Sequence, residues 1–258
     1  MKRRTLLSVL LSACLAFALP LRAQAAPPAI AAAGDLRGVL EELTGAFEAR
    51  HPGAHFQLTF GASGNLTVQI QQGAPFDIFL AADTGFPETV VKAGLATGDG
   101  TFPYAKGSLT LWVRKDLHLD PARDGLRVLL HPSVKKVATA NPQVAPYGRA
   151  GDAALRRAGL FEAVKPKLVF GDNIAQAAQF LQAGAAEAGL ISGSQARNPV
   201  LQNAGTAWKV PADAYPPLVQ AGVILKRTAH LERARAFMAF LVGPDGQAIL
   251  ARHGFARP

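Results

Sequence analysis

Residues 59–68 read TFGASGNLTV, and four small residues stand at the centre of this stretch. A hydrophobic strand predicted over His55–Phe60 ends just before them, and a helical pattern begins at Asn65. Gly and Ser are common in such turns for their backbone freedom alone. A helix N-terminus also offers unpaired N–H groups and the positive end of a dipole, which suit an anion. The stretch by itself leaves both interpretations open.

Three further junctions between a predicted strand and a predicted helix have the same small or turn-forming composition. They read AGDL at 33–36, NPQVAPYGR at 141–149 and FGDNI at 170–174. In open α/β sheets, ligands bind beyond the carboxyl ends of the strands, where such junctions gather. We therefore predict a neutral cage of N–H and hydroxyl donors for an oxyanion, with two junctions from each half of the chain facing a common cleft.

Short apolar strands alternate with amphipathic helices along the chain, which predicts the α/β fold class with mostly parallel sheets. Two long apolar strands divide this pattern into two lobes. Tyr104–Val113 has no helix before it, so we interpret it as the crossing from the first lobe to the second, and Leu218–Leu225 as the return. The predicted domains are a discontinuous lobe 1, residues 26–105 and 218–258, and a lobe 2, residues 106–217.

The first 25 residues have the composition of a cleaved signal peptide. A basic start, MKRR, precedes a run of about 16 mostly apolar residues and an A-x-A cleavage site at Ala23–Ala25. The apolar run is short for a membrane-spanning helix, which needs about 20 residues. LSAC, ending at Cys14, resembles a lipoprotein signal, and RRTLL resembles a twin-arginine signal. The sequence therefore predicts export, with a lipid anchor as a minor alternative.

Charge and cysteine content restrict the function classes. The whole chain has 27 Lys and Arg against 18 Asp and Glu, and four of these bases but no acid lie in the leader, which leaves the mature chain at +5. No basic run is interleaved with aromatic residues, which argues against nucleic-acid binding. The single cysteine, Cys14, lies in the leader, so the mature chain forms no disulfide.

Metal-binding and catalytic motifs are absent from the sequence. The six histidines form no H-E-x-x-H motif, and the two that are four residues apart, His51 and His55, flank the helix-stopping Pro52-Gly53, so we predict no metal site. The G-x-S-x-G motif of serine hydrolases is also missing. A periplasmic hydrolase using Ser63 remains the alternative from another class, but His55 is the only histidine close to any of the four junctions in sequence.

Three stretches carry a family resemblance: FGASGN at 60–65, TFPYAKGSLTLW at 101–112 and above all ANPQVAPYGRAG at 140–151. They resemble the periplasmic molybdate-binding proteins of ABC transporters, and the resemblance extends through essentially the whole mature chain. It implies a type II periplasmic binding fold that closes on molybdate or tungstate, without a cofactor or a protein–metal ligand. The implied partners are a membrane permease and its ATPase, and the implied protein is a periplasmic monomer without enzyme activity.

The resemblance also implies ligand-binding positions. Ser63 matches a serine that gives both its hydroxyl and its backbone N–H. Tyr147 and Ile174 match positions that give backbone N–H groups, so their side chains matter less. Gly34 matches a position where family members offer Ser or Thr, and here only the N–H could serve. Ser192 matches a position where some members place a Tyr, which is longer.

Asp35 departs from the family pattern, because some relatives have Asn at this position. An ionised Asp only accepts hydrogen bonds and repels a dianion. One interpretation is that its carboxylate turns onto the N–H groups of Arg37 or Gly38 as a helix cap, which is typically worth about 1 kcal/mol. The other is a ligand that carries a proton, which Asp35 would accept. This position also leaves open a protein tuned to another small oxyanion.

Overall fold

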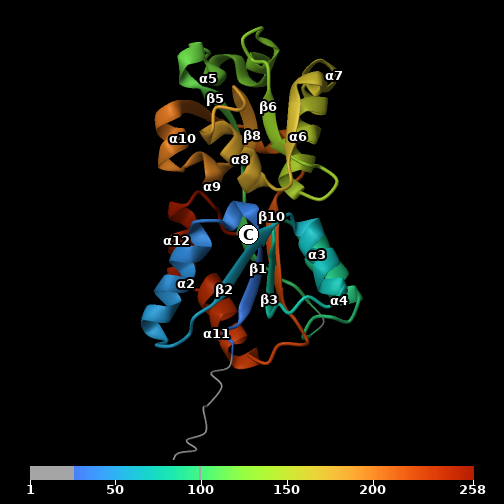
Figure 1. Cartoon of the computed structure of the whole chain (residues 1–258), viewed down its shortest axis with the longest axis vertical. Helices are drawn as coiled ribbons and strands as arrows, with labels where there is room; N and C mark the ends of the chain where they lie inside the picture. Colours follow the sequence, from blue (N-terminus) through green and yellow to red (C-terminus); the bar gives the residue numbers. More distant parts are fainter. Residues whose placement is uncertain (1–25, 99) are drawn as a thin grey trace, which may run out of the picture.

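The computed structural model describes residues 26–98 and 100–258. Its long axis runs through two lobes, each built on one five-stranded sheet flanked by helices (Figure 1). The α/β two-lobed fold expected from the sequence is therefore present. The predicted signal peptide lies outside the described residues. Within them, no helix is long and apolar enough to cross a membrane.

The lobe 1 sheet has the strand order β2-β1-β3-β10-β4. Its strands are β1 (Ala29–Ala33), β2 (Gln57–Gly61), β3 (Ile78–Ala81), β4 (Phe102–Lys106) and β10 (Val219–Ile224). Strands β2, β1 and β3 pair in parallel, while β10 is antiparallel to both β3 and β4. The sheet is therefore mixed, because β10 enters it from the other lobe.

The lobe 2 sheet repeats this plan in the order β7-β6-β8-β5-β9. Its strands are β5 (Leu109–Arg114), β6 (Val137–Ala140), β7 (Leu168–Gly171), β8 (Ala188–Ser192) and β9 (Gly205–Lys209). Here β5 is the antiparallel strand, between β8 and β9. The predicted single strand Tyr104–Val113 is wrong in one respect: it is two strands, β4 and β5, because the chain changes sheets at Gly107 and Ser108.

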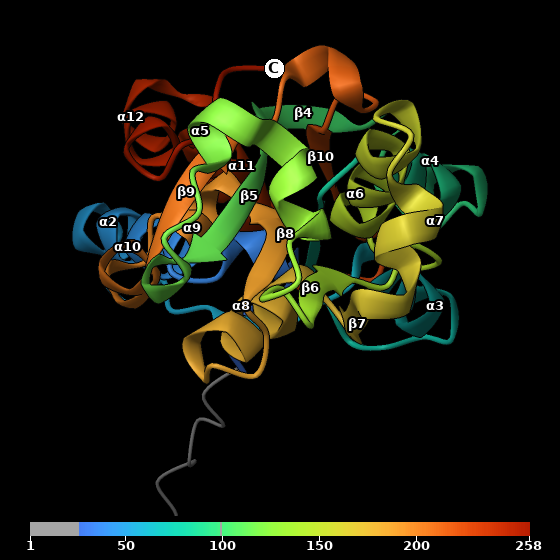
Figure 2. The ribbon, with the colours of Figure 1, turned by 90° about the horizontal axis from the view of Figure 1, so that it is seen from above.

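Helices cover both faces of each sheet (Figures 1 and 2). Lobe 1 has α2 (Val39–Arg50), α3 (Ser63–Gln71), α4 (Gly85–Lys92), α11 (Leu231–Val242) and α12 (Pro244–Arg252). Lobe 2 has α5 (Pro121–Asp124), α6 (Pro146–Arg157), α7 (Phe161–Val164), α8 (Ile174–Gln182), α9 (Gly193–Ala196) and α10 (Pro199–Ala204). Seen along the long axis, α6 and α7 lie on the same side of the molecule as α3 and α4.

Separate hydrophobic cores hold the lobes. In lobe 1, one cluster around Phe47 and Phe237 packs α2, α11 and α12 on one face of the sheet, and a second around Phe79 packs α3 and α4 on the other. The core of lobe 2 centres on Trp112 and is continuous with residues at the lobe boundary such as Ala62. Apolar burial, at about 25 cal/mol per Å², stabilises each lobe.

Candidate functional site

The four predicted junctions meet around one cavity between the lobes. The gap among its lining residues is narrow, with a volume of about 10 Å³. Five of the six predicted site residues line it: Gly34, Asp35, Ser63, Tyr147 and Ile174. They come from the carboxyl ends of β1 and β2 in lobe 1 and from the starts of α6 and α8 in lobe 2. The sequence-based prediction of a common cleft therefore agrees with the geometry.

Ser63 is the first residue of α3, and both its hydroxyl and its backbone N–H are available as hydrogen-bond donors to a ligand. The Ala82 N–H donates to the Ser63 Oγ at 3.1 Å, so the hydroxyl proton is not needed to satisfy that contact. Among the described residues, the Ser63 N–H has no protein acceptor, as expected at the first position of a helix. Ser63 is buried and α3 has no side-chain cap. An anion here would meet a hydroxyl, an N–H and the positive end of the helix.

Lobe 2 contributes backbone donors. Pro146 occupies the first position of α6, which makes Tyr147 the first residue of that helix with an N–H. At α8, the Asn173 side chain accepts from the Ala175 and Gln176 N–H groups at 2.9 and 3.2 Å. Within the described chain, the N–H groups of Tyr147 and Ile174 have no protein acceptor. Asn173 therefore caps two donors of α8 and leaves the Ile174 N–H for a ligand.

Gly34 is in close contact with the start of α8. A Cβ added at Gly34 would lie 2.8 Å from the Asn173 Oδ1 and 3.2 Å from the Ala175 N. The Gly34 carbonyl oxygen accepts from the Gln195 Nε2 of lobe 2 at 3.0 Å. A side chain at this position would therefore require Asn173 and the start of α8 to shift, so the absence of one allows a closer approach of the two lobes.

Asp35 does not cap a helix, so that interpretation is wrong. It lies in a 3₁₀ turn, Gly34–Leu36, without a side-chain cap, and the turn is separated from α2 by Gly38 at φ 88°. Because Gly38 interrupts the helical geometry, the Asp35 carboxylate does not reach the N–H groups of α2. Asp35 is fully buried, its Oδ2 accepts from the Gln220 Nε2, and its Oδ1 has no partner among the described residues.

Burial raises the pKa of Asp35 to about 6, against the opposing effect of hydrogen bonds from Gln220 and Tyr147. Gln220 is itself held by the Tyr104 hydroxyl, which donates to its Oε1 at 2.8 Å. Gly107 leaves room for this arrangement, since a Cβ there would lie 2.1 Å from the Tyr147 hydroxyl. The sequence did not indicate these three supporting residues, because they are distant from the junctions along the chain and belong to no recognisable motif.

Ser192, the sixth predicted residue, does not line the cavity. Its Oγ accepts from the Gln195 N–H at 3.1 Å and so caps the short helix α9. The same hydroxyl is 2.9 Å from the Ser194 Oγ. In this structure the Ser192 side chain therefore serves as a helix cap beside the cavity, and its predicted role in ligand binding stays a prediction.

Direct contacts hold the lobes closed around the cavity. The Gly64 N–H of lobe 1 donates to the Val144 carbonyl oxygen at 2.9 Å. The Ser194 Oγ of lobe 2 donates to the Asp35 carbonyl oxygen at 2.7 Å. At the rim, Arg149 of α6 forms an ion pair with Asp83, which follows β3. Arg149 therefore links the lobes and is not a free surface cation.

The described residues contain neither a metal centre nor a catalytic pair at this site. In residues 26–98 and 100–258, no group of three or more His, Cys, Asp or Glu side chains could hold a metal ion. The Ser63 Oγ accepts a hydrogen bond from the Ala82 N–H, and no histidine of the described residues forms a hydrogen bond with it. A serine nucleophile requires a base within hydrogen-bond reach, so the geometry favours binding.

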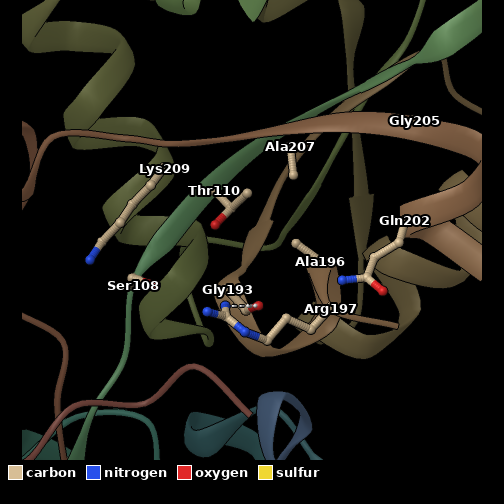
Figure 3. A pocket seen from close by; sticks show the side chains of 9 residues that line it. All are labelled: Ser108, Thr110, Gly193, Ala196, Arg197, Gln202, Gly205, Ala207 and Lys209. Atoms are coloured by element: carbon tan, nitrogen blue, oxygen red, sulfur yellow. Dashed lines mark hydrogen bonds between the residues drawn. The ribbon is translucent and has the colours of Figure 1, made fainter. Parts of the chain in front are cut away.

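A wider pocket lies on lobe 2, along the edge strand β9 (Figure 3). Its volume is about 420 Å³, and its lining includes two cations, Arg197 and Lys209. The Arg197 guanidinium donates to the Gly193 carbonyl oxygen at 3.2 Å. This pocket lacks the converging helix N-termini of the smaller cavity, so it does not share the features of a site for a small oxyanion.

Comparison with known proteins agrees with this geometry. The family model described as "Bacterial extracellular solute-binding protein" matches residues 29–256. The molybdate-binding protein ModA of Azotobacter vinelandii is 38% identical over 233 residues, which is 90% of this chain and 91% of that protein. ModA of Rhodobacter capsulatus is 39% identical over 197 residues, 76% of this chain and 75% of that protein.

The same similarity appears in three dimensions. The solved periplasmic molybdate-binding protein of Azotobacter vinelandii superposes with a TM-score of 0.82 at 32% sequence identity, covering 90% of this chain and 99% of that one. The matched family model extends over both lobes and all four junctions. The chain therefore belongs to the family of bacterial extracellular solute-binding proteins.

Proposed function

We propose that this protein captures molybdate or tungstate in the cavity between its lobes and delivers the anion to an ABC importer. The observation that carries the proposal is the convergence of three helix N-termini, those of α3, α6 and α8, on one small cavity. The similarity to two proteins named for molybdate binding supports the choice of anion. No bond is made or broken, and no cofactor takes part.

Hydrogen bonds alone would hold the anion. Ser63 would donate through its hydroxyl and its N–H, while Gly34, Tyr147 and Ile174 would donate through backbone N–H groups. A hydrogen bond to a charged group contributes about 1.5–3 kcal/mol net. Five such donors, less the entropy of ordering, are sufficient for micromolar or tighter binding. Because each lobe supplies part of the cage, the ligand favours the closed arrangement of the lobes.

The proposed route begins with export. The leader, residues 1–25, would direct the chain to the periplasm, where it would act as a monomer. The closed, loaded protein would then dock on a membrane permease that is driven by an ATPase. Residues Gly34, Asp35, Ser63, Tyr147 and Ile174 form the proposed ligand site.

Calorimetric titration of the dialysed mature protein with molybdate, tungstate, sulfate and phosphate tests the proposal. We expect one-to-one binding of molybdate and tungstate in the micromolar range or tighter at pH 6, and binding at least 100-fold weaker for the two smaller anions. Binding of a different anion in preference would retain the solute-binding role and replace the ligand. Absence of heat with both molybdate and tungstate would contradict the proposed ligand.

A further inference from the structure

One of the residues that line the cavity proposed for an anion has a buried carboxylate. Asp35 lines the cavity, is fully buried, and has an Oδ1 with no hydrogen-bond partner among the described residues. An unpaired buried charge is unfavourable by several kcal/mol, and an added anion would make it more so. The Asp35 Oδ1 is therefore an acceptor that a proton on a bound ligand could satisfy.

The groups around Asp35 supply hydrogen bonds but no compensating charge. From β10, Gln220 donates to the Oδ2, and from α6, the Tyr147 hydroxyl stabilises the charged form. Burial raises the pKa of Tyr147 and of Tyr104 on β4 well above the ordinary value, so both phenols stay neutral. Towards lobe 2, α8 presents the neutral Asn173, and α9 the neutral Ser194 and Gln195.

Arg149, the cation that links the two lobes, is already paired with a carboxylate. Arg149 bonds Asp83 at the rim of the cavity. Within the described residues, no Lys, Arg or His side chain forms an ion pair with Asp35, and none contributes to its pKa shift. A dianion beside an ionised Asp35 would place three negative charges in one closed cage. Like charges at such separation force one group to bind a proton.

We propose that the cage recognises its oxyanion together with one proton, held between the Asp35 Oδ1 and an oxygen of the anion. The inference rests on the proposed function and adds a specificity element to it. The proton comes from solution and bonds to whichever oxygen is the more basic, so one proton is taken up and no other bond changes. The Asp35 Oδ1 then has the partner that it lacks in the protein alone, and the net charge of the cage falls by one.

The direction of the pH dependence follows from the Asp35 pKa of about 6 in the protein without ligand. A bound dianion raises this pKa further, because it favours the protonated carboxyl. Above pH 6 the free protein has lost the proton and must regain it on binding. Each unit of pH above that value therefore weakens binding about tenfold, a slope that fades as the pH falls below 6.

The test counts protons. Molybdate is titrated into the mature protein at several pH values from 5.5 to 8.5, in buffers of different ionisation enthalpy. For the wild type we expect uptake of about one proton per anion at pH 8 and a dissociation constant about tenfold higher at pH 8 than at pH 7. Asp35→Asn keeps the size of the side chain without its charge, so it should take up no proton and bind at least tenfold more tightly at pH 8.

Asp172→Asn is the matched control, because Asp172 is an exposed carboxyl in the neighbouring junction and does not line the cavity. It should show the proton uptake and pH slope of the wild type.

Tight binding by the wild type with no proton uptake and a flat pH profile would overturn the inference and leave the proposed function intact. Absence of molybdate and tungstate binding at every pH, by both wild type and Asp35→Asn, would overturn the proposed ligand and the inference with it. The measurement on the wild type stands alone if the Asp35 variant fails to fold.

Discussion

The two lobes contribute to the same cavity by different means. Lobe 2 offers backbone N–H groups at the starts of α6 and α8, where Pro146 and the Asn173 cap determine which donors stay free. Lobe 1 adds side chains to its own backbone N–H groups: the Ser63 hydroxyl and the Asp35 carboxylate, on a helix start and a 3₁₀ turn without side-chain caps. Backbone donors change little with sequence, whereas side chains carry specificity. Lobe 1 is therefore where substitutions should alter anion choice.

The sharpest contrast is between the junction carboxyls of the two lobes, Asp35 in lobe 1 and Asp172 in lobe 2. The folded pKa of Asp35, about 6, is above its ordinary value of 3.8. The contribution of Asp35 protonation to the free energy of unfolding is thus fully present below pH 3.8, and it is lost as the pH rises through 6. The difference of about two pKa units corresponds to at most about 3 kcal/mol. Asp35→Asn should be more stable than the wild type by up to that amount at pH 7.5, and equal to it near pH 4.

Urea unfolding without ligand at pH 4, 5 and 7.5 measures this difference. Asp172→Asn serves as the lobe 2 control, and we expect it to stay within about 0.5 kcal/mol of the wild type at each pH, as surface substitutions usually do. A stability difference between Asp35→Asn and the wild type that does not change from pH 4 to 7.5 would show that burial of this carboxylate carries no cost.

A comparison of Ser63 and Ser192 distinguishes a residue of the proposed ligand site from a residue beside it. Ser63→Ala removes a hydroxyl donor to a charged ligand, worth about 1.5–3 kcal/mol, and should weaken molybdate binding about 10- to 100-fold. Ser192→Ala removes only the cap of α9, so we expect a loss of about 1 kcal/mol in the free energy of unfolding and an affinity within twofold of the wild type. Calorimetry and urea unfolding of both variants check this. Equal losses of affinity would contradict the placement of Ser192 outside the site.

The approach of lobe 1 to α8 can be blocked at one position. Gly34→Ala puts a Cβ 2.8 Å from the Asn173 Oδ1, so it should hinder closure and raise the dissociation constant for molybdate at least tenfold. The contact joins two lobes, so unfolding of the ligand-free protein should change by less than about 0.5 kcal/mol. Gly45→Ala, where an added Cβ meets nothing within 4 Å, is the control. An unchanged affinity for Gly34→Ala would mean that the loaded lobes stay further apart.

The smallest effect is expected at the rim. Arg149→Ala breaks the ion pair with Asp83 between the lobes, which is partly exposed and therefore worth at most about 1 kcal/mol. Molybdate affinity should fall by no more than about fivefold, and less in 0.5 M salt, because ions screen the pair. Arg156→Ala, which breaks an ion pair within α6, should leave affinity unchanged. Calorimetry at two salt concentrations compares them, and a larger loss at high salt would contradict this role.

The four junctions were predictable because the signal is local. A strand that ends in small residues and is followed at once by a helix brings N–H groups to the carboxyl edge of a sheet, whatever the rest of the chain does. The structure brings Ser63, Tyr147 and Ile174, which were predicted from the junctions and the family resemblance, to one cavity. Gln220, Tyr104 and Gly107 were not predicted, because Gln220 bonds Asp35 from a distant part of the chain and the other two contact Gln220 or Tyr147.

The sequence by itself determined the α/β class, the two crossings between lobes, and the presence of junctions able to bind an anion, since all of these depend on periodicity and on residue types next to one another. Only the tertiary structure decided the direction of two side chains. Ser192 turned to cap α9, and Asp35 turned from the predicted cap into a buried network. The physical reason is that a polar side chain bonds the nearest unsatisfied partner, and packing of the two lobes determines which partner is near.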